Sequence, residues 1–594
     1  MSARAPEATP EQLLARFGLE GFRPGQREAV AAALAGRDSL VVMPTGGGKS
    51  LCYQLPALAG RGLVVVVSPL IALMADQWQR LQDAGVSAVM LASGMAEGHN
   101  ERALAQIADG TAALVLAAPE RFASRAFAAA LAQRSVALFV VDEAHCVAEW
   151  GHDFRPDYLR LHGAIAALGR PPVMAATATA TPRVAEEIAA RLELREWVSI
   201  RSGFDRPNLA FDVVTVEGKG AMARKWAALT YALSQADSLP AIVYAGTRRD
   251  TDTLCERLAG EGLTAVAYHA GMAPAARAES QRAFMEGDAD VVVATNAFGM
   301  GVDKADVRTV AHWALPTSLE AYYQEAGRGG RDGLPARALL LAARVDLGRL
   351  IRFINDRATT VDDVRAFVGR LRRSLPEGEE AATVGHDALG DRDRVLLSIA
   401  ERAGAVELAP AGREGLLVRA TGKGSPRRAQ EAIRASQNRA WESYRSIERY
   451  MQAETCRRAL ILEHFGDPAQ GAPEGRCCDV CDPDSGLAGA IARAGSGVGA
   501  SRRRAAAGGR APAIDGDEAS REPVDEQKFE VLRAWRMERA EGLPAYTVAT
   551  NAVLEEVLVR RPRDVGELIE IRGVGRGFCE KHGDSLLEAL AGLP

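Results

Sequence analysis

Short apolar runs alternate with amphipathic helical patterns along the chain up to about Asp346. The first series of runs reads SLVVM, LVVVVS, AALVLAA, ALFVV and PPVMAA, and the second reads AIVYA, TAVAYHA, DVVVAT, VRTVAHW and RALLLAA. Buried strands separated by amphipathic helices are typical of parallel sheets with helices on both faces. The two series meet near residues 203–208, so the pattern predicts two α/β domains with a cleft between them.

Charged helical patterns replace the apolar runs after Asp346. Residues 360–420 are predicted to form helices followed by the hairpin GAVELAPAGREGLLVRA, with its turn at Gly412 and Gly415, and this order indicates a winged helix. Residues 485–522 are rich in Gly, Ala, Ser and Arg and are predicted to form a flexible linker. Beyond them, apolar residues at helical spacing predict a small helical domain. These residues are Phe529, Leu532, Trp535, Val553, Leu554, Val557 and Leu558.

The bulk composition is that of a globular protein of several domains, with 47% hydrophobic residues. A formal net charge of -5 argues against a protein that coats nucleic acid through an overall positive charge, but it is compatible with a local basic channel. The segment MSARAPEATPEQLL has no apolar core typical of a signal peptide, and the run LVVVVSPLIALMA is too short to span a bilayer. We therefore expect a soluble cytoplasmic protein.

A glycine-rich segment between the first apolar run and a helical pattern is the first candidate for chemistry. Residues 44–50 read PTGGGKS, in which Thr45, Gly46, Gly47 and Gly48 let the backbone fold around phosphates. Lys49 supplies a charge for the β- and γ-phosphates, and Ser50 supplies a hydroxyl for Mg²⁺. The strict P-loop pattern has Gly at the position of Met43, so the match is to the looser TGxGKS form. The alternative, a glycine turn that happens to end in GKS, is disfavoured by the strand before it and the helix after it.

Two acidic residues follow the run ALFVV, and two arginines lie in the second α/β region. Asp142 is expected to hold hydrated Mg²⁺, and Glu143 to orient or deprotonate the attacking water. Arg328 and Arg331, in YYQEAGRGGRDG, are spaced to face one side of a helix. Arginines supplied across a cleft make hydrolysis depend on closure of the domains. The alternative is a pair of surface arginines in a salt-bridged helix, which the glycine-rich surroundings disfavour.

Taken together, these segments resemble superfamily 2 helicases, and within them the RecQ family of DNA helicases. The resemblance covers residues 17–346 and includes, in the order of the family, FRPGQREAV, TGGGKS, DEAH, TATAT, FDRPNL, ATNAFGMGVDK and QEAGRGGRDG. It implies that the two α/β domains are tandem RecA-like parallel-sheet domains. It also implies that Gln26 reads adenine and that Gln324 belongs to the nucleotide site.

The segment WGHDFRP, which follows DEAH closely, resembles the aromatic-rich loop through which the family couples single-stranded DNA to ATP hydrolysis. Trp150 and Phe154 offer faces for base stacking, and Arg155 offers a phosphate or cation–π contact. The resemblance adds His152 to this DNA-binding group. The alternative is that Trp150 and Phe154 are ordinary core residues. Their polar neighbours and their position after a catalytic strand disfavour it.

Four of the eight cysteines lie close together in the sequence, which in a reducing compartment indicates metal. CRRALILEHFGD and GRCCDVCDP resemble the RecQ zinc module, and the resemblance implies tetrahedral Zn²⁺ on Cys456, Cys477, Cys478 and Cys481. Cys477 departs from the family pattern because it is adjacent to Cys478. One alternative is that His464 or water completes the zinc site instead of Cys477. Another is a cluster of thiols without metal.

The C-terminal modules also carry a resemblance. The winged-helix-like stretch precedes the zinc module, whereas in the common RecQ layout it follows, and this leaves open whether it contacts duplex DNA. The last residues resemble an HRDC domain, and IRGVGRGF, at residues 571–578, resembles a helix-hairpin-helix turn that could meet a phosphate. Arg572, Arg576 and Lys581 add charge there, and a purely structural turn is the alternative.

The predicted fold class is therefore α/β, with two tandem RecA-like domains followed by smaller modules. The predicted ranges are 1–203 and 204–350 for the RecA-like domains, 351–435 for the winged-helix-like segment, 436–484 for the helical zinc module, 485–522 for the linker and 523–594 for the all-α HRDC-like domain.

The resemblance implies an ATP-dependent DNA helicase that moves 3′→5′ on single-stranded DNA, acts in DNA repair or recombination, and uses ATP, Mg²⁺ and Zn²⁺. Expected partners are single-stranded and duplex DNA, with single-strand-binding protein as a candidate, and the expected state is a monomer. Two alternatives are an RNA helicase of the same superfamily and a DNA-binding scaffold with a vestigial ATPase.

Overall fold

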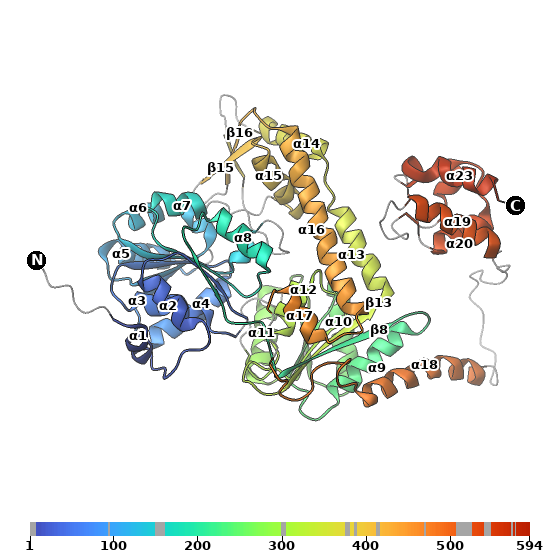
Figure 1. The fold of residues 1–594 in the computed structure, drawn as a ribbon, viewed down its shortest axis with the longest axis horizontal. Helices are drawn as coiled ribbons and strands as arrows, with labels where there is room; N and C mark the ends of the chain where they lie inside the picture. Colours follow the sequence, from blue (N-terminus) through green and yellow to red (C-terminus); the bar gives the residue numbers. More distant parts are fainter. Residues whose placement is uncertain are drawn as a thin grey trace, which may run out of the picture. The chain divides into compact units, whose positions relative to one another are not determined.

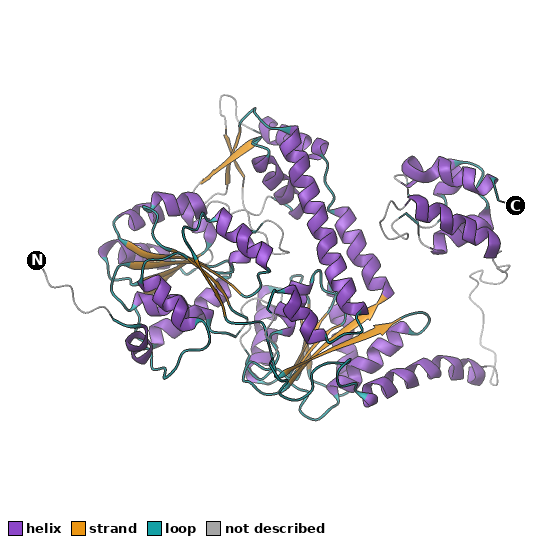
Figure 2. Ribbon diagram, viewed as in Figure 1, coloured by secondary structure: helices purple, strands orange, loops and turns teal. Residues whose placement is uncertain are grey.

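The computed structural model describes most of the chain and divides it into two compact units, Met1–Arg502 and Arg503–Pro594. Figures 1 and 2 show the helices and strands of both units. The described residues are 8–44, 46–92, 95–148, 158, 161–296, 298, 304–374, 381–384, 389–410, 416–467, 471–505, 526–539, 548–549, 551–571, 574–575 and 578–593. Among them, no helix has the length and apolar character needed to cross a bilayer.

A seven-stranded parallel sheet forms the first α/β domain, with the strand order β3-β4-β2-β5-β6-β1-β7. Its strands are β1 (Ser39–Val42), β2 (Leu63–Val67), β3 (Ala88–Leu91), β4 (Leu114–Ala117), β5 (Val136–Val141), β6 (Val173–Thr177) and β7 (Val198–Arg201). The helices of this domain are α1 (Pro10–Arg16), α2 (Gln26–Leu34), α3 (Lys49–Ala57), α4 (Ile71–Asp83), α5 (His99–Asp109), α6 (Arg125–Ala132), α7 (Leu161–Ala167) and α8 (Pro182–Arg191). The five predicted runs are β1, β2, β4, β5 and β6, whereas the edge strands β3 and β7 were not predicted.

A six-stranded parallel sheet forms the second α/β domain, with the order β10-β11-β9-β12-β13-β8. Its strands are β8 (Leu209–Val216), β9 (Ala241–Tyr244), β10 (Ala265–Tyr268), β11 (Val291–Ala294), β12 (Thr309–His312) and β13 (Ala336–Ala343). Its helices are α9 (Ala221–Leu233), α10 (Arg248–Gly260), α11 (Pro274–Glu286) and α12 (Leu319–Ala326). The five predicted runs are β9 to β13, and the edge strand β8 was not predicted. The prediction of two parallel-sheet domains is confirmed.

A small antiparallel sheet with the order β14-β16-β15 follows the second domain. The elements of this part are α13 (Arg344–Asp356), α14 (Val361–Arg373), β14 (Ala381–Val384), α15 (Asp391–Arg402), β15 (Val406–Pro410), β16 (Leu416–Ala420) and α16 (Pro426–Gln452). The predicted hairpin is present as β15 and β16, while Gly412 and Gly415 lie outside the described residues. Helices α14, α15 and α16 share one apolar core with this sheet, and a winged-helix-like role for this segment stays a prediction.

The predicted border between residues 435 and 436 needs correction, because it lies inside helix α16. This 27-residue helix runs without interruption from Pro426. Its first part packs Ala432 and Ile433 into the winged-helix-like core. Its last part buries Tyr444, Ile447 and Tyr450. The next helix, α17 (Arg457–His464), has Cys456 as its N-cap and is drawn beside the end of α16 in Figure 1. One helix therefore belongs to both modules.

The predicted flexible linker also needs correction over its first half, because residues 485–505 form helix α18 (Ser485–Ala505). Leu487 and Ile491 are four residues apart and face the same side of this helix, and both pack on the apolar core around β8, β9 and β13. Alanine, a strong helix former, supplies many of the remaining positions. The other residues of the predicted linker, 506–522, lie outside the described residues.

The C-terminal unit is helical, as predicted. It contains α19 (Glu526–Arg539), α20 (Asn551–Arg560), α21 (Val565–Ile569), a short π-helix (Cys579–Gly583) and α23 (Asp584–Ala591). Its apolar core includes Leu532, Trp535, Val553, Leu554, Val557 and Leu558, with Phe529 packed against it. The residues singled out by their spacing are therefore those that hold this unit together.

Candidate functional site

The glycine-rich loop between β1 and α3 is shaped by Gln26 at the start of α2. The side-chain amide nitrogen of Gln26, Nε2, donates hydrogen bonds to the carbonyl oxygens of Gly48 at 3.0 Å and Gly47 at 3.3 Å. Gly48 has a φ of +78°, and a Cβ there would lie 2.3 Å from Gln26 Nε2, so only glycine fits this contact. Arg23 adds a hydrogen bond to the carbonyl oxygen of Gly46. The predicted residue Thr45 lies outside the described residues.

Helix α3 begins at Lys49, so its first backbone N–H groups end at the loop, where a helix favours anions. Lys49 Nζ donates to the carbonyl oxygen of Met43 at 3.2 Å. Ser50 Oγ accepts a hydrogen bond from Gln77 Nε2 at 3.1 Å, and Gln77 Oε1 accepts one from Tyr53 at 3.1 Å. This chain of contacts fixes the hydroxyl that was predicted to bind Mg²⁺. Gln77 had no signal in the sequence, because it lies on α4, far from the loop along the chain.

The two acidic residues follow β5 and are both largely buried. Burial raises the pKa of Asp142 to about 7, and the adjacent Glu143 carboxylate raises it as well. Burial also acts to raise the pKa of Glu143, but the hydrogen bond with His145 and the charges of Lys49 and Arg328 lower it to about 2. A bound dication would stabilise both carboxylates in their charged form.

Glu143 is held in an uncommon backbone conformation, with a φ of +48°. Such a conformation costs a non-glycine residue about 1–3 kcal/mol and persists only where surrounding contacts hold it. His145 Nδ1 lies 3.2 Å from Glu143 Oε2 and 3.0 Å from Thr177 Oγ1. The DEAH segment is therefore tied to the first threonine of TATAT at the end of β6.

The glycine-rich loop of the second domain reaches the first domain through Arg331. A Cβ at Gly46 would lie 3.5 Å from Arg331 Cγ, which places this arginine against the P-loop. Arg328 is only 5% exposed, and its charge helps to lower the pKa of the Glu143 carboxylate. Gln324 is buried on helix α12, which leads into the two arginines. The structure thus brings together the P-loop, the acidic pair and the arginine loop.

The aromatic-rich segment that follows DEAH was predicted to bind DNA. Trp150, His152, Phe154 and Arg155 lie outside the described residues. The nearby Tyr158 is described: it is buried, and its hydroxyl donates to the backbone carbonyl oxygen of Asp142 at 3.1 Å. This contact, which was not predicted, joins Tyr158 to the backbone of the acidic pair.

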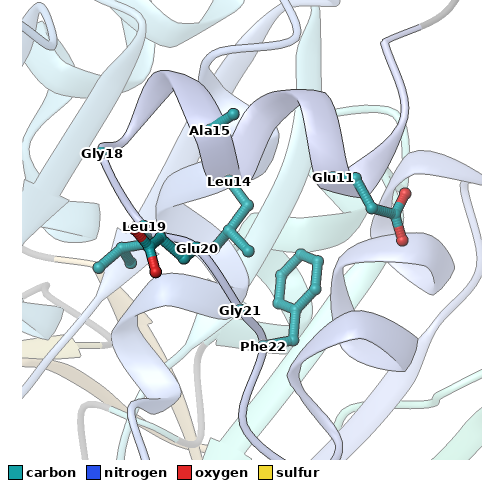
Figure 3. A pocket seen from close by; sticks show the side chains of 8 residues that line it. All are labelled: Glu11, Leu14, Ala15, Gly18, Leu19, Glu20, Gly21 and Phe22. Carbon is teal, nitrogen blue, oxygen red and sulfur yellow. The ribbon is translucent and has the colours of Figure 1, made fainter.

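A pocket of about 660 Å³ lies between helix α1 and the loop that follows it. Figure 3 shows that Leu14 and Phe22 project into this region, with Glu11 beside them. The loop continues into Arg23 and Gln26, but neither residue lines the pocket. The pocket is therefore next to the P-loop site and does not contain its predicted residues.

The four clustered cysteines converge on one point. The sulfur atoms of Cys456, Cys477, Cys478 and Cys481 lie within 4.8 Å of one another, and Cys456 Sγ is 3.7 Å from Cys477 Sγ. Tetrahedral Zn²⁺ with sulfur at about 2.3 Å needs sulfur atoms about 3.8 Å apart, so the donor set fits this metal. The adjacency of Cys477 and Cys478 therefore does not prevent convergence.

His464, the alternative to Cys477, faces another partner. Its Nε2 lies 2.8 Å from Glu320 Oε1 on helix α12. The loop of Cys477 and Cys478 pairs with β8 instead: the Phe211 N–H donates to the carbonyl oxygen of Cys477 at 3.1 Å. The cysteine cluster is thereby attached to the second α/β domain.

In the C-terminal unit, only part of the predicted phosphate-binding turn is described. Lys581 is exposed, whereas Arg572 and Arg576 lie outside the described residues.

Comparison with known proteins finds four family models along the chain. They are the DEAD/DEAH box helicase at residues 23–188, the helicase conserved C-terminal domain at 224–333, the RecQ zinc-binding domain at 423–482 and the HRDC domain at 525–590. The zinc-binding match begins before Pro426, in agreement with helix α16 being one continuous element.

Curated relatives of the chain are named as ATP-dependent DNA helicases. The chain is 41% identical over 344 residues to the ATP-dependent DNA helicase RecQ of Haemophilus influenzae, covering 58% of this chain and 55% of that protein. It is 34% identical to the RecQ helicase of Pasteurella multocida, covering 79% of this chain and 62% of that protein. It is 38% identical to the probable ATP-dependent DNA helicase RecS of Bacillus subtilis, covering 61% of this chain and 72% of that protein. The chain therefore spans just over half of the length of the first two relatives.

The matching family models lie in the expected order, the cysteines converge, and a relative is matched over more than two thirds of its length. This chain belongs to the RecQ family of helicases.

Proposed function

We propose that this protein is an ATP-dependent DNA helicase that translocates 3′→5′ on single-stranded DNA and acts in DNA repair or recombination. The observation that carries the proposal is the contact of Arg331, from the second α/β domain, with Gly46 of the P-loop in the first. Arginines supplied from a second domain make hydrolysis sensitive to the closure of the cleft. The names of the relatives, which are DNA helicases, support DNA as the substrate.

The chain's own residues can perform the steps of hydrolysis. Lys49 and the first N–H groups of α3 bind the phosphates, Glu143 orients the attacking water, and Arg328 and Arg331 stabilise the charge that develops on the γ-phosphate. Ser50 and Asp142 would hold Mg²⁺, which would supply positive charge to offset the negative charge of the phosphates. Opening one base-pair step costs about 1.4 kcal/mol of stacking. This cost is small beside the free energy of one ATP hydrolysed, so one base pair for each ATP is feasible.

Steady-state ATP hydrolysis tests the proposal. The rate is measured without nucleic acid, with single-stranded DNA, and with single-stranded RNA of the same sequence. Strong stimulation by DNA alone, followed by unwinding of a 3′-tailed but not a 5′-tailed duplex, is the expected result. Equal stimulation by RNA would favour an RNA helicase, and no hydrolysis at all would favour a DNA-binding scaffold. The same assays with single-strand-binding protein, and sedimentation of the protein alone, test the proposed partner and the proposed monomer.

Replacing Trp150 by alanine is expected to keep the basal rate of ATP hydrolysis and to remove its stimulation by single-stranded DNA. The reason is that a base stacked on an aromatic side chain contributes about 1–3 kcal/mol to binding. Trp441→Ala is the matched control, because Trp441 lies on helix α16 with its ring 5.7 Å from that of Tyr444. Stimulation of the Trp150 variant equal to that of the unmodified protein would show that this loop does not couple DNA to hydrolysis.

A further inference from the structure

The short segment between the two parallel sheets, residues 204–208, is in contact with two other parts of the protein. It follows β7, which ends at Arg201, and precedes β8, which begins at Leu209. On one side it meets the loop that carries Arg328 and Arg331, and on the other it meets the cysteine module. We call it the connecting segment.

Arg206 of the connecting segment holds the backbone of the arginine loop. Its guanidinium donates hydrogen bonds to the carbonyl oxygens of Gly327 at 3.0 Å, Gly329 at 2.7 Å and Gly330 at 3.1 Å. Gly327 is the C-cap residue of α12, and the carbonyl groups at a helix C-terminus need donors and favour a cation. The guanidinium of Arg206 supplies both the hydrogen-bond donors and the positive charge.

Asn208 holds the same loop at a second point. Its Nδ2 donates to the carbonyl oxygens of Gly330 and Leu334, both at 2.8 Å. Gly330 has a φ of +58°, and a Cβ there would lie 2.5 Å from Asn208 Nδ2. The contact therefore requires glycine at this position. Together, Arg206 and Asn208 hold the backbone on both sides of Arg328 and Arg331.

The cysteine module packs against the other side of the connecting segment. The ring of Phe204 stacks on that of Phe465, with centroids 4.2 Å apart and planes 4° apart. The Phe204 N–H donates to Asp467 Oδ2 at 2.6 Å. Asp205 accepts two hydrogen bonds from the guanidinium of Arg458, whose side chain is 2% exposed. Arg458 and Phe465 lie on and next to helix α17, which begins directly after Cys456.

Helix α17 also contacts α12, which leads into the arginine loop. His464 meets Glu320, as described above, and the ring centroids of Tyr323 and Phe465 are 5.0 Å apart. The Tyr323 hydroxyl donates to the carbonyl oxygen of Phe204 at 2.7 Å. Three parts therefore form one packed unit: helix α17, the connecting segment and helix α12.

We propose that Arg206 is a positioning residue for ATP hydrolysis, and that helix α17 of the cysteine module holds it in place through Asp205 and Phe204. Its three hydrogen bonds fix the backbone of the loop from which Arg328 and Arg331 reach the phosphates. Small displacements of such groups are costly, since a shift of about 1 Å can lower a rate about 100-fold. The catalytic role of Arg206 rests on the proposed ATP hydrolysis, whereas its role in holding the backbone of the arginine loop does not.

Arg206→Ala and Arg206→Lys in the full chain test the proposal. Arg206→Ala is expected to lower kcat about 10- to 100-fold, while KM for ATP and the affinity for single-stranded DNA stay within about twofold, because the arginines act mainly on the transition state. Arg206→Lys keeps the charge but lacks the planar fork that reaches several carbonyl oxygens, so an intermediate kcat is expected. Arg282→Ala is the matched control, since Arg282 pairs with Glu279 and Glu286 on the surface of α11 and is expected to leave kcat unchanged.

Amide hydrogen exchange in the peptide that covers residues 327–333 gives a readout independent of catalysis. Faster exchange in this peptide is expected for Arg206→Ala and also for Asp205→Asn, which removes the charge facing Arg458. Unchanged exchange in this peptide for Arg206→Ala would overturn the proposal, whether or not the protein hydrolyses ATP. Faster exchange across the whole second domain, with a parallel loss of kcat and nucleotide affinity, would also overturn it by showing a purely structural role. If the unmodified protein hydrolyses no ATP, the proposed function fails, and the exchange result still decides whether Arg206 holds the loop.

Discussion

Lys49→Ala is expected to lower kcat for ATP hydrolysis by at least about 100-fold, the loss typical when a group that stabilises transition-state charge is removed. The structure supports this expectation, because Lys49 is the first residue of α3 and its charge acts on both Asp142 and Glu143. Alanine is compatible with the helix start, and it removes the cation together with its hydrogen bond to the carbonyl oxygen of Met43. Hydrolysis is measured at saturating ATP with single-stranded DNA present.

Two controls separate the loss of a catalytic charge from a general loss of structure. Lys219→Ala removes an exposed lysine from the turn before α9 and is expected to leave the rate unchanged. Thermal unfolding and DNA affinity of the Lys49 variant are expected to match those of the unmodified protein. A Lys49 variant that hydrolyses ATP at the normal rate would contradict the assigned nucleotide site and would return the scaffold hypothesis to first place.

Cys478→Ser is expected to reduce bound zinc from about one ion per chain to a small fraction of that, since structural zinc sites need all four protein ligands. Cys478 is fully buried, and its loop is paired with β8. Zinc binding in small zinc domains is worth about 10–16 kcal/mol, so a variant without the metal is expected to lose the ordered cysteine loop. Metal analysis of the purified protein and limited proteolysis near residues 456–482 measure the two effects.

Cys255→Ser is the matched control for this prediction. Cys255 lies on α10, outside the cluster, and its sulfur contacts the carbonyl oxygen of Ala265 at 3.2 Å. The control is expected to keep its zinc and its resistance to protease. A Cys478 variant that retains a full equivalent of zinc would show that the remaining three cysteines and another donor suffice.

Every interior strand of the two parallel sheets was predicted, and so was the edge strand β10, whereas the edge strands β3, β7 and β8 were not. The central strands β2 and β5 are buried on both faces, and both were predicted. The edge strand β7 has half-buried ends, an exposed Ser199 and a buried Ile200, so its apolar run is short and mixed. The edge strand β8 is buried but contains Asp212 and Thr215, which interrupt the apolar pattern.

Helix α18 was predicted to be a linker because local composition does not report the surface on which a segment packs. Its glycine and serine content is typical of a linker, but the second sheet supplies an apolar surface for Leu487 and Ile491. Most helical stability in proteins comes from packing of an apolar face, so a neighbouring surface can outweigh local composition.

The amino-acid sequence by itself determined two parallel-sheet domains, a P-loop followed by a helix, an acidic pair after a strand, and four thiols suited to zinc. These features depend on residues close together along the chain, where periodicity and spacing report local structure. Only the tertiary structure decided that Arg331 lies against Gly46, that Arg206 holds the loop between the two arginines, and that Cys477 joins the other cysteines. Each of these contacts joins residues on different elements, and the packing of those elements sets whether their side chains meet.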